Sequence, residues 1–255
     1  MARIKKMLED ANGNGGTVTL ERLPLQQPPR RGGGEEAPEP PPVRLTIKAP
    51  NFQTIRVGII GTAPYVQNRF SMKARETIRG TQVAGSRAKK GKAREPKDFD
   101  ALYEGAQYHG LPLYAKKSDD PWHGIPAAAF RNAMISACRM VGYKMTMAKL
   151  SVFIIADGFD TEDGTALVRI TKGEPHYHEG YVRNATGVVD LRARPMWDGG
   201  WEASVTIKFD GDQFAREDVA NLLMRAGLGG VGEGRPDSKS SAGLGWGTFD
   251  IREVK

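Results

Sequence analysis

The sequence predicts an α+β fold whose core runs in the order strand, helix, strand, strand, helix, strand. An apolar residue at every second position over 53–61 predicts the first core strand. Apolar residues spaced three and four apart predict helices over 126–141 and 215–226. Alternation over 248–254 predicts a strand that ends the core.

Composition indicates one domain of ordinary size. The chain has 255 residues, 39% of them hydrophobic, which is enough for one substantial core. We expect a flexible arm rich in proline and glycine over 1–42 and a single domain over 43–255. Cys138 is the only cysteine, which excludes an intrachain disulfide and suits a cytoplasmic protein. Since no apolar run is long enough to span a bilayer, we expect no membrane partner.

Positive charge is concentrated in 65–97, inside a long insertion that we predict over 62–124. This segment holds ten cations and two anions, an excess of eight positive charges against a net charge of +7 for the whole chain. Tyr65, Phe70 and Phe99 lie among or beside these charges, and single strands favour such mixing of cations with aromatic rings. The alternative is a solvated loop that binds nothing. We expect phosphate contacts from Arg69, Lys73, Arg75, Arg87, Lys89, Lys90, Lys92 and Arg94.

The helix predicted over 126–141 has clear ends. Pro126 occupies its first position, and Gly142 follows its last turn. Its apolar stripe includes Phe130 and Met134, and Cys138 lies on the same stripe. We therefore expect Cys138 to be a core residue and not a nucleophile.

Further apolar segments predict strands over 43–48, 150–156, 166–170, 188–194 and 201–209. The sequence Asp198-Gly199-Gly200 predicts a hairpin turn between the last two of these strands.

Few residues suggest catalysis. Glu174, His176 and His178 alternate, so in a strand they would share one side and could face a metal. Because no second group of ligands accompanies them, we predict no metal and no cofactor. The sequence contains no GxSxG, HExxH or CxxC motif. Four aspartates could bind a metal or act as a base, but nothing pairs them; these are Asp98, Asp100, Asp119 and Asp120.

A glycine-rich segment over 227–247 separates the second helix from the last strand. P-loops and dinucleotide-binding turns follow a strand and open a helix, so this order excludes both. We expect Gly232 and Gly234 to let a ligand backbone approach closely, because glycine has no Cβ and tolerates positive φ. Arg235 and Lys239 would supply cations to a polyanion. A linker without function is the alternative.

The element order is that of a ferredoxin-like (RRM-like) βαββαβ core, with the basic insertion after the first core strand and the glycine-rich loop before the last. Two local sequences resemble the RAMP superfamily, the RNA-binding proteins of CRISPR effector complexes. The segment 227–249 resembles their glycine-rich loop in place and composition. Ile125-Pro126-Ala-Ala-Ala-Phe-Arg131-Asn-Ala resembles the start of their first helix, which carries an arginine at the position of Arg131.

This resemblance implies that Arg131 contacts RNA and that 65–122 is the thumb-like extension of a backbone subunit. It also implies that copies of the chain polymerise along a guide RNA. The chain departs from the family pattern in its proline-rich arm, and no repeat-processing histidine can be assigned. A viral or mobile-element member that binds single strands is equally consistent with these residues.

Two functional classes follow. The first is a non-catalytic protein that lays single-stranded RNA or DNA, with RNA favoured, across its sheet and holds it with the glycine-rich loop and the basic insertion. Such a protein would form a homo-oligomer or a filament on the strand. The second is a metal-dependent or acid–base nuclease on the same fold, with Asp98 or Asp100, or His176 and His178, at the scissile phosphate. The lack of a coherent catalytic set favours the first class, and a viral structural protein is a third interpretation.

Overall fold

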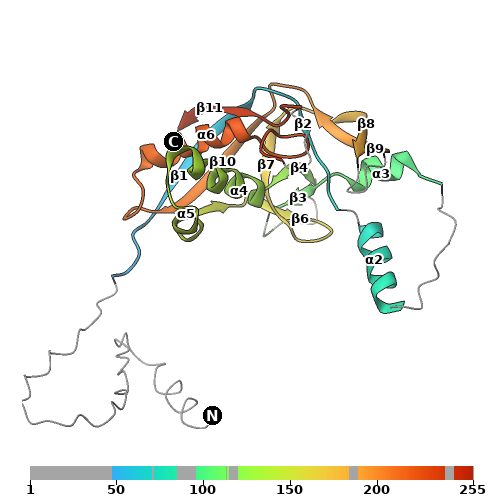
Figure 1. Cartoon of the computed structure of the whole chain (residues 1–255), viewed down its shortest axis with the longest axis horizontal. Helices are drawn as coiled ribbons and strands as arrows, with labels where there is room; N and C mark the ends of the chain where they lie inside the picture. Colours follow the sequence, from blue (N-terminus) through green and yellow to red (C-terminus); the bar gives the residue numbers. More distant parts are fainter. Residues whose placement is uncertain are drawn as a thin grey trace, which may run out of the picture. The chain divides into compact units, whose positions relative to one another are not determined.

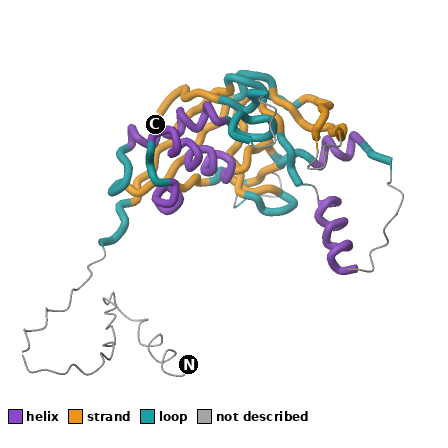
Figure 2. Tube along the Cα trace, in the orientation of Figure 1, coloured by secondary structure: helices purple, strands orange, loops and turns teal. Residues whose placement is uncertain are grey.

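Two antiparallel sheets organise the part of the chain that the computed structural model describes (Figures 1 and 2). The described residues are 48–70, 72–84, 96–112, 114, 120–183, 189–238 and 244–254. Lys48–Lys255 form one compact unit. The α+β class predicted from the sequence is therefore confirmed. The arm predicted over 1–42 lies outside the described residues, and so does the strand predicted over 43–48 except for Lys48.

The larger sheet has eight strands and carries most of the core. In spatial order its strands are β11 (Phe249–Val254), β1 (Phe52–Gly61), β10 (Glu202–Asp210), β7 (Ala166–Lys172), β4 (Trp122–Pro126), β3 (His109–Leu111) and β6 (Gly158–Asp160). The eighth strand, β5 (Val152–Ile155), pairs with β10. The smaller sheet has the order β2 (Tyr65–Val66), β9 (Val189–Trp197) and β8 (His176–Arg183).

Two helices pack on one face of the larger sheet, where Figure 1 shows them side by side over β1 and β10. The helix predicted over 126–141 is observed as α4 (Ala127–Ala137) followed by the 3-10 helix η2 (Cys138–Val141). The helix predicted over 215–226 is α6 (Arg216–Gly229). Their apolar stripes share one buried cluster with alternate residues of the strands, including Ile55, Val57, Phe130, Met134, Cys138, Val205, Ile207, Leu222 and Leu223. The other helices are α2 (Met72–Ala84), α3 (Phe99–Gly105) and α5 (Met145–Ser151).

The turn at 198–200 does not form the hairpin that the sequence predicts, because β9 and β10 belong to different sheets. After the turn, the backbone N–H of Gly61 donates to the Trp201 carbonyl at 2.7 Å, and Gly200 donates to Gly61 at 2.8 Å. The chain therefore pairs with the end of β1 and not with β9. Turn residues specify a reversal of direction, but they leave the pairing partner open. The strand predicted over 150–156 is also shorter than expected, since Leu150 and Ser151 belong to α5.

An aromatic cluster lies where the two sheets meet. The Tyr65 ring is 5.3 Å from the Trp197 ring and 5.6 Å from the Trp201 ring, measured between centroids. All three side chains are buried. The Trp201 indole occupies the space beside Gly61 and donates its Nε1–H to the Ala63 carbonyl at 3.0 Å. A Cβ at Gly61 would overlap this indole, so the cluster requires glycine at the end of β1.

We expect Gly61→Ala to lower the free energy of unfolding by about 1–3 kcal/mol, the usual cost of overpacking a core. Gly80→Ala is the matched control, because a Cβ at Gly80 in α2 meets no atom within 4 Å. That change should be neutral or stabilise by up to about 1 kcal/mol, as alanine favours a helix. Urea unfolding of the two variants measures the difference. Equal free energies of unfolding for the two variants would show that the Trp201 indole tolerates a Cβ at position 61.

Candidate nucleic-acid interface

The glycine-rich loop, described over 230–238 and 244–248, packs against the segment that follows β1. Glu233 donates its backbone N–H to Val66 at 2.9 Å, and Gly247 donates to Pro64 at 2.6 Å. Val231 donates to Gly247 at 2.9 Å, which ties the two ends of the loop together. The loop is therefore held at both ends by backbone hydrogen bonds.

Gly232 and Gly234 both have positive φ, of 80° and 70°. A Cβ at Gly232 would lie 2.5 Å from the Tyr65 ring and 2.6 Å from the Val66 carbonyl oxygen. A Cβ at Gly234 would lie 2.5 Å from the Trp246 ring. The close approach that these glycines permit is thus to the chain's own aromatic rings. Contact of this loop with a nucleic acid stays a prediction.

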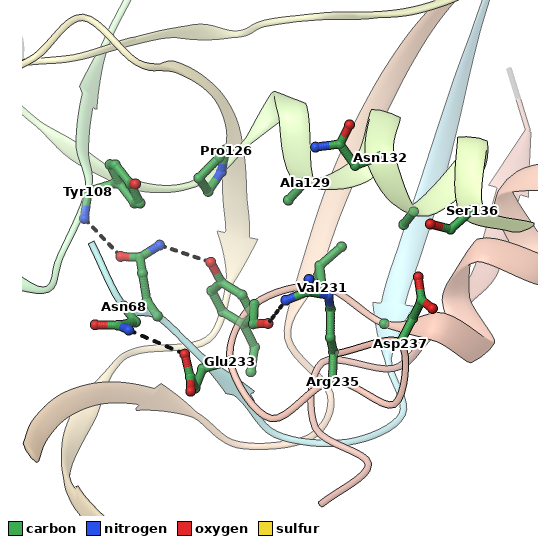
Figure 3. A pocket seen from close by; sticks show the side chains of 15 residues that line it. Asn68, Tyr108, Pro126, Ala129, Asn132, Ser136, Val231, Glu233, Arg235 and Asp237 are labelled. Carbon is green, nitrogen blue, oxygen red and sulfur yellow. Dashed lines mark hydrogen bonds between the residues drawn. The ribbon is translucent and has the colours of Figure 1, made fainter. Parts of the chain in front are cut away.

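A hollow of about 270 Å³ opens between α4 and the glycine-rich loop (Figure 3). Ala129, Asn132 and Ser136 of α4 form one wall, and the loop residues from Gly230 to Asp237 form the other. Small residues on α4 leave room between the helix and the loop. The hollow is therefore a consequence of the Ala-rich helix face meeting a glycine-rich backbone.

Gln67 lines the hollow, and its side chain makes three hydrogen bonds. Its Nε2 donates to the Gly124 carbonyl at 2.7 Å and to the Tyr65 hydroxyl at 3.0 Å. Its Oε1 accepts from the backbone N–H of Tyr108 at 2.8 Å. Burial raises the pKa of Tyr65 well above the ordinary value, so this hydroxyl stays protonated. With its polar atoms occupied, Gln67 is a structural residue of the site.

Glu233 links the loop to both neighbouring elements. Its carboxylate accepts from the Asn68 side chain at 3.2 Å and lies 3.6 Å from the Arg194 guanidinium of β9. The Arg194 side chain is only 6% exposed, so this carboxylate supplies charge compensation for a buried cation. Through Arg194, the smaller sheet thereby helps to hold the glycine-rich loop in place.

Charged groups of both signs line the hollow. Among the described residues that line it, the charged groups are Glu233, Arg235 and Asp237. Arg235 donates one Nη1–H to the Gly232 carbonyl at 2.9 Å, and Arg139 pairs with Asp237 at 2.7 Å. One guanidinium between two carboxylates suits a polar ligand better than a cluster of phosphates.

Sequence patterns did not identify Asn68, Asn132 or Ser136, which line this hollow. Asn132 and Ser136 are four residues apart and therefore lie on one face of α4. The four-residue spacing can be read from the sequence. The position of the glycine-rich loop opposite these two side chains cannot.

Arg69 is buried in an ion pair, which differs from its predicted contact with phosphate. Its Nη2 lies 2.8 Å from Asp160 and its Nη1 lies 2.7 Å from Glu162, with the Arg69 side chain 2% exposed. Asp160 also accepts backbone N–H groups of His109, Glu162 and Asp163. The guanidinium is therefore enclosed by the turn after β6 and does not face solvent.

Arg75 of α2 binds the same turn, through Asp163 at 2.5 Å, although 44% of its side chain is exposed. Burial alone would raise the pKa of Asp163. The hydrogen bonds from Thr165 and the charge of Arg75 outweigh burial and hold that pKa at about 2. Asp163 is therefore ionised at neutral pH and keeps Arg75 paired.

Arg131 also has a structural position. Its Nε donates to the Val152 carbonyl at 2.9 Å, its Nη2 donates to the Lys149 carbonyl, and its guanidinium lies 5.4 Å from the Phe153 ring centroid. These bonds join α4 to α5 and β5. The RNA contact implied by the family resemblance would compete with them.

The remaining predicted cations are not placed. Arg87, Lys89, Lys90, Lys92, Arg94 and Lys239 lie outside the described residues. Lys73 belongs to α2, but its side chain is not among those described.

The histidines of β8 contact protein groups. The His178 ring lies 5.4 Å from the Trp246 ring of the glycine-rich loop, and burial lowers the pKa of His178, with smaller effects of His176 and Arg194. His176 lies 3.9 Å from Asp198. Within the described ranges, no group of three or more His, Cys, Asp or Glu side chains could hold a metal ion. In the same ranges, no helix is both long and apolar enough to cross a membrane.

We expect Arg69→Met to lower the free energy of unfolding by about 3–5 kcal/mol, because it leaves the buried Asp160 carboxylate without its cation. The control is Arg79→Met, an exposed position on α2, which should change stability by less than about 0.5 kcal/mol. Chemical unfolding of both variants tests this. An Arg69→Met protein of unchanged stability would show that the pair does not hold the turn.

We expect Gly232→Ala and Gly234→Ala to destabilise the protein more than Gly245→Ala. All three glycines have positive φ, which costs alanine roughly 1–2 kcal/mol. Only at Gly245 does an added Cβ meet no atom within 4 Å, whereas the other two would collide with rings. Thermal unfolding ranks the variants. Equal melting temperatures would show that the rings move aside freely.

The chain was compared with protein-family models, curated proteins and solved structures. No protein-family model matches the sequence, and no curated protein matches it either. Among solved structures, the chain is similar to one in the "Cryo-EM structure of the Type III-B Cmr-beta bound to cognate target RNA", with a TM-score of 0.42 and 10% sequence identity. The similarity covers 80% of this chain and 60% of that one, so this chain spans less than two thirds of the matched chain's length.

Proposed function

We propose that this protein binds single-stranded nucleic acid without cleaving it, with RNA favoured over DNA. The observation that carries the proposal is the charge of 65–97, where ten cations face two anions. In the described residues, Arg69, Arg75 and Lys97 of this segment pair with Asp160, Asp163 and Asp190. The other seven cations exceed the two anions of the segment, and a polyanion backbone would compensate them.

The arrangement of the strands supports a ferredoxin-like core for this function. The order β11, β1, β10, β5 is antiparallel throughout, α4 follows β1, and α6 connects β10 to β11. This is the connectivity inferred for a βαββαβ core, with the basic insertion between β1 and α4. The RAMP-like local sequences, and not this connectivity, are the support for a protein that assembles in several copies along one strand.

Replacing Arg87, Lys89, Lys90, Lys92 and Arg94 by alanine should weaken binding equally for all sequences. It should also reduce the slope of log affinity against log salt by about 0.7 for each lost phosphate contact. The control replaces four exposed cations near α5 and α6, namely Lys144, Lys149, Arg216 and Arg225. Titration of labelled RNA and DNA single strands at several salt concentrations measures both variants. If the control variant loses as much affinity and salt dependence as the test variant, binding depends only on net charge and the insertion is not the site.

The same titrations, repeated with Mg²⁺, Mn²⁺ or Zn²⁺, separate binding from catalysis. Intact strands are the expected result. Products that form with metal and disappear in the His176→Ala, His178→Ala double variant would replace the binding proposal with a nuclease.

A further inference from the structure

The face of the larger sheet opposite α4 and α6 carries polar and aromatic side chains. Along β1, the buried Ile55 and Val57 alternate with the exposed Phe52, Thr54 and Arg56. The same alternation on β10 puts Ser204, Thr206 and Lys208 on this face. Phe52 is 45% exposed and Ile155 of β5 is 42% exposed, so this face is open in the described part of the chain.

A hollow of about 420 Å³ lies on this open face, between β1 and β10 on one side and β7 and β4 on the other. Its lining includes two arginines, one tryptophan, one carboxylate and two hydroxyls. These are Arg56, Arg169, Trp122, Asp157, Thr171 and Ser204.

Three glycines set the position of the Trp122 ring. A Cβ on Gly110, Gly124 or Gly158 would lie 2.6, 2.9 or 2.8 Å from atoms of this ring. These glycines belong to the neighbouring strands β3, β4 and β6. The indole therefore lies over bare backbone, and it remains half-buried where it lines the hollow. The Arg169 guanidinium is 5.8 Å from the centroid of the ring.

Within the described ranges, no hydrogen bond is made by the terminal nitrogens of the two guanidinium groups in the hollow. Arg56 uses its Nε to donate to the Ser204 hydroxyl at 2.8 Å, which orients the group and leaves its terminal nitrogens without a partner among the described residues. Asp157 accepts the backbone N–H of Arg169 at 2.9 Å, so this bond does not occupy the Arg169 guanidinium. Two such groups beside an aromatic ring are complementary to a phosphate and a base.

Aromatic and cationic groups continue along the same face. Phe52 lies 6.3 Å from Phe153 of β5, and Lys208 Nζ is 4.3 Å from the Phe52 centroid. Phe52 and Lys208 are on the strands that also carry Arg56 and Ser204, and Phe153 is on β5, which pairs with β10. The open face thus repeats one combination, a ring with a cation, at two places.

We propose that the open face is a second surface for single-stranded nucleic acid, distinct from the basic insertion and the glycine-rich loop. One base stacks on Trp122, Arg56 and Arg169 bind the adjacent phosphate, and the strand continues toward Phe52 and Lys208. The ligand class rests on the proposed function, whereas the site and its residues are independent of it. Stacking on aromatic rings accepts every base, so this surface would bind strands with little regard to sequence.

Three variants of the full chain test the site. Trp122→Leu should reduce affinity for mixed-sequence RNA on the order of tenfold, the effect of losing one stacked base, and Trp122→Phe should restore most of it. Arg56→Gln combined with Arg169→Gln should reduce the salt slope by about 0.7 for each lost contact. Arg225→Gln on α6 is the matched control for charge on the other face and should bind as the unmodified protein does. Thermal unfolding shows whether each variant is folded.

Photocross-linking gives a readout that does not depend on substitutions. RNA containing 5-iodouridine should cross-link to Trp122, and mass spectrometry of the peptides identifies the residue. Wild-type affinity in Trp122→Phe, Trp122→Leu and the arginine double variant would overturn the second surface. Self-association that changes in these variants, with RNA affinity unaltered, would also overturn it in favour of a protein partner.

The insertion variant separates this proposal from the proposed function. If substitution of the five insertion cations weakens binding while the open-face variants bind normally, the second surface is wrong and the proposed function stands. If the unmodified chain binds no single strand, the proposed function fails and this proposal fails with it. If the open-face variants weaken binding and the insertion variant does not, the open face is the principal site.

Discussion

The Tyr65 ring lies where the two sheets and the glycine-rich loop meet, and much of the structure depends on its packing. Trp197 at the end of β9 and Trp201 immediately before β10 contact it from the two sheets. Gly232 brings the backbone of the loop against the same ring. These contacts join strands that are far apart in the sequence, and the buried aromatic area supplies much of the hydrophobic stabilisation at this junction. Gly61 and Gly232 are required because no side chain fits beside these rings.

Several arginines in regions suggested as binding sites stabilise the fold itself. Arg69 is enclosed by acidic groups of one turn, and Arg131 donates to backbone carbonyls at the end of α5. A guanidinium has five donors, which suit carbonyls and carboxylates of the protein as well as phosphates. Residue type and local charge therefore do not distinguish a structural arginine from one that binds a ligand. The burial of the guanidinium and the identity of its acceptor distinguish the two kinds of arginine.

The hollow beside α4 and the hollow on the open face differ in chemistry as well as in place. The one beside α4 is lined by amides, hydroxyls and groups of both charges, and Gln67 and Glu233 tie its walls together. The one on the open face has two guanidinium groups, one carboxylate and an indole, and the Arg169 guanidinium lies 5.8 Å from the centroid of that indole. A polyanion with aromatic bases matches the second lining more closely, since phosphates need cations and bases need rings. The lining of the hollow beside α4 suits a ligand that is recognised through individual hydrogen bonds.

Sequence alone determined the parts of this protein that depend on neighbours along the chain. Periodicity predicted β1, α4, β10, α6 and β11, because the spacing of apolar residues within one element reflects which side is buried. The charge excess of 65–97 and the place of the glycine-rich loop are likewise properties of the chain itself. Only the tertiary structure decided which strands pair across the turn at 198–200, which ring fills the space beside Gly232, and which arginines are buried. Those outcomes depend on contacts between residues distant in sequence, and local patterns carry no information about such partners.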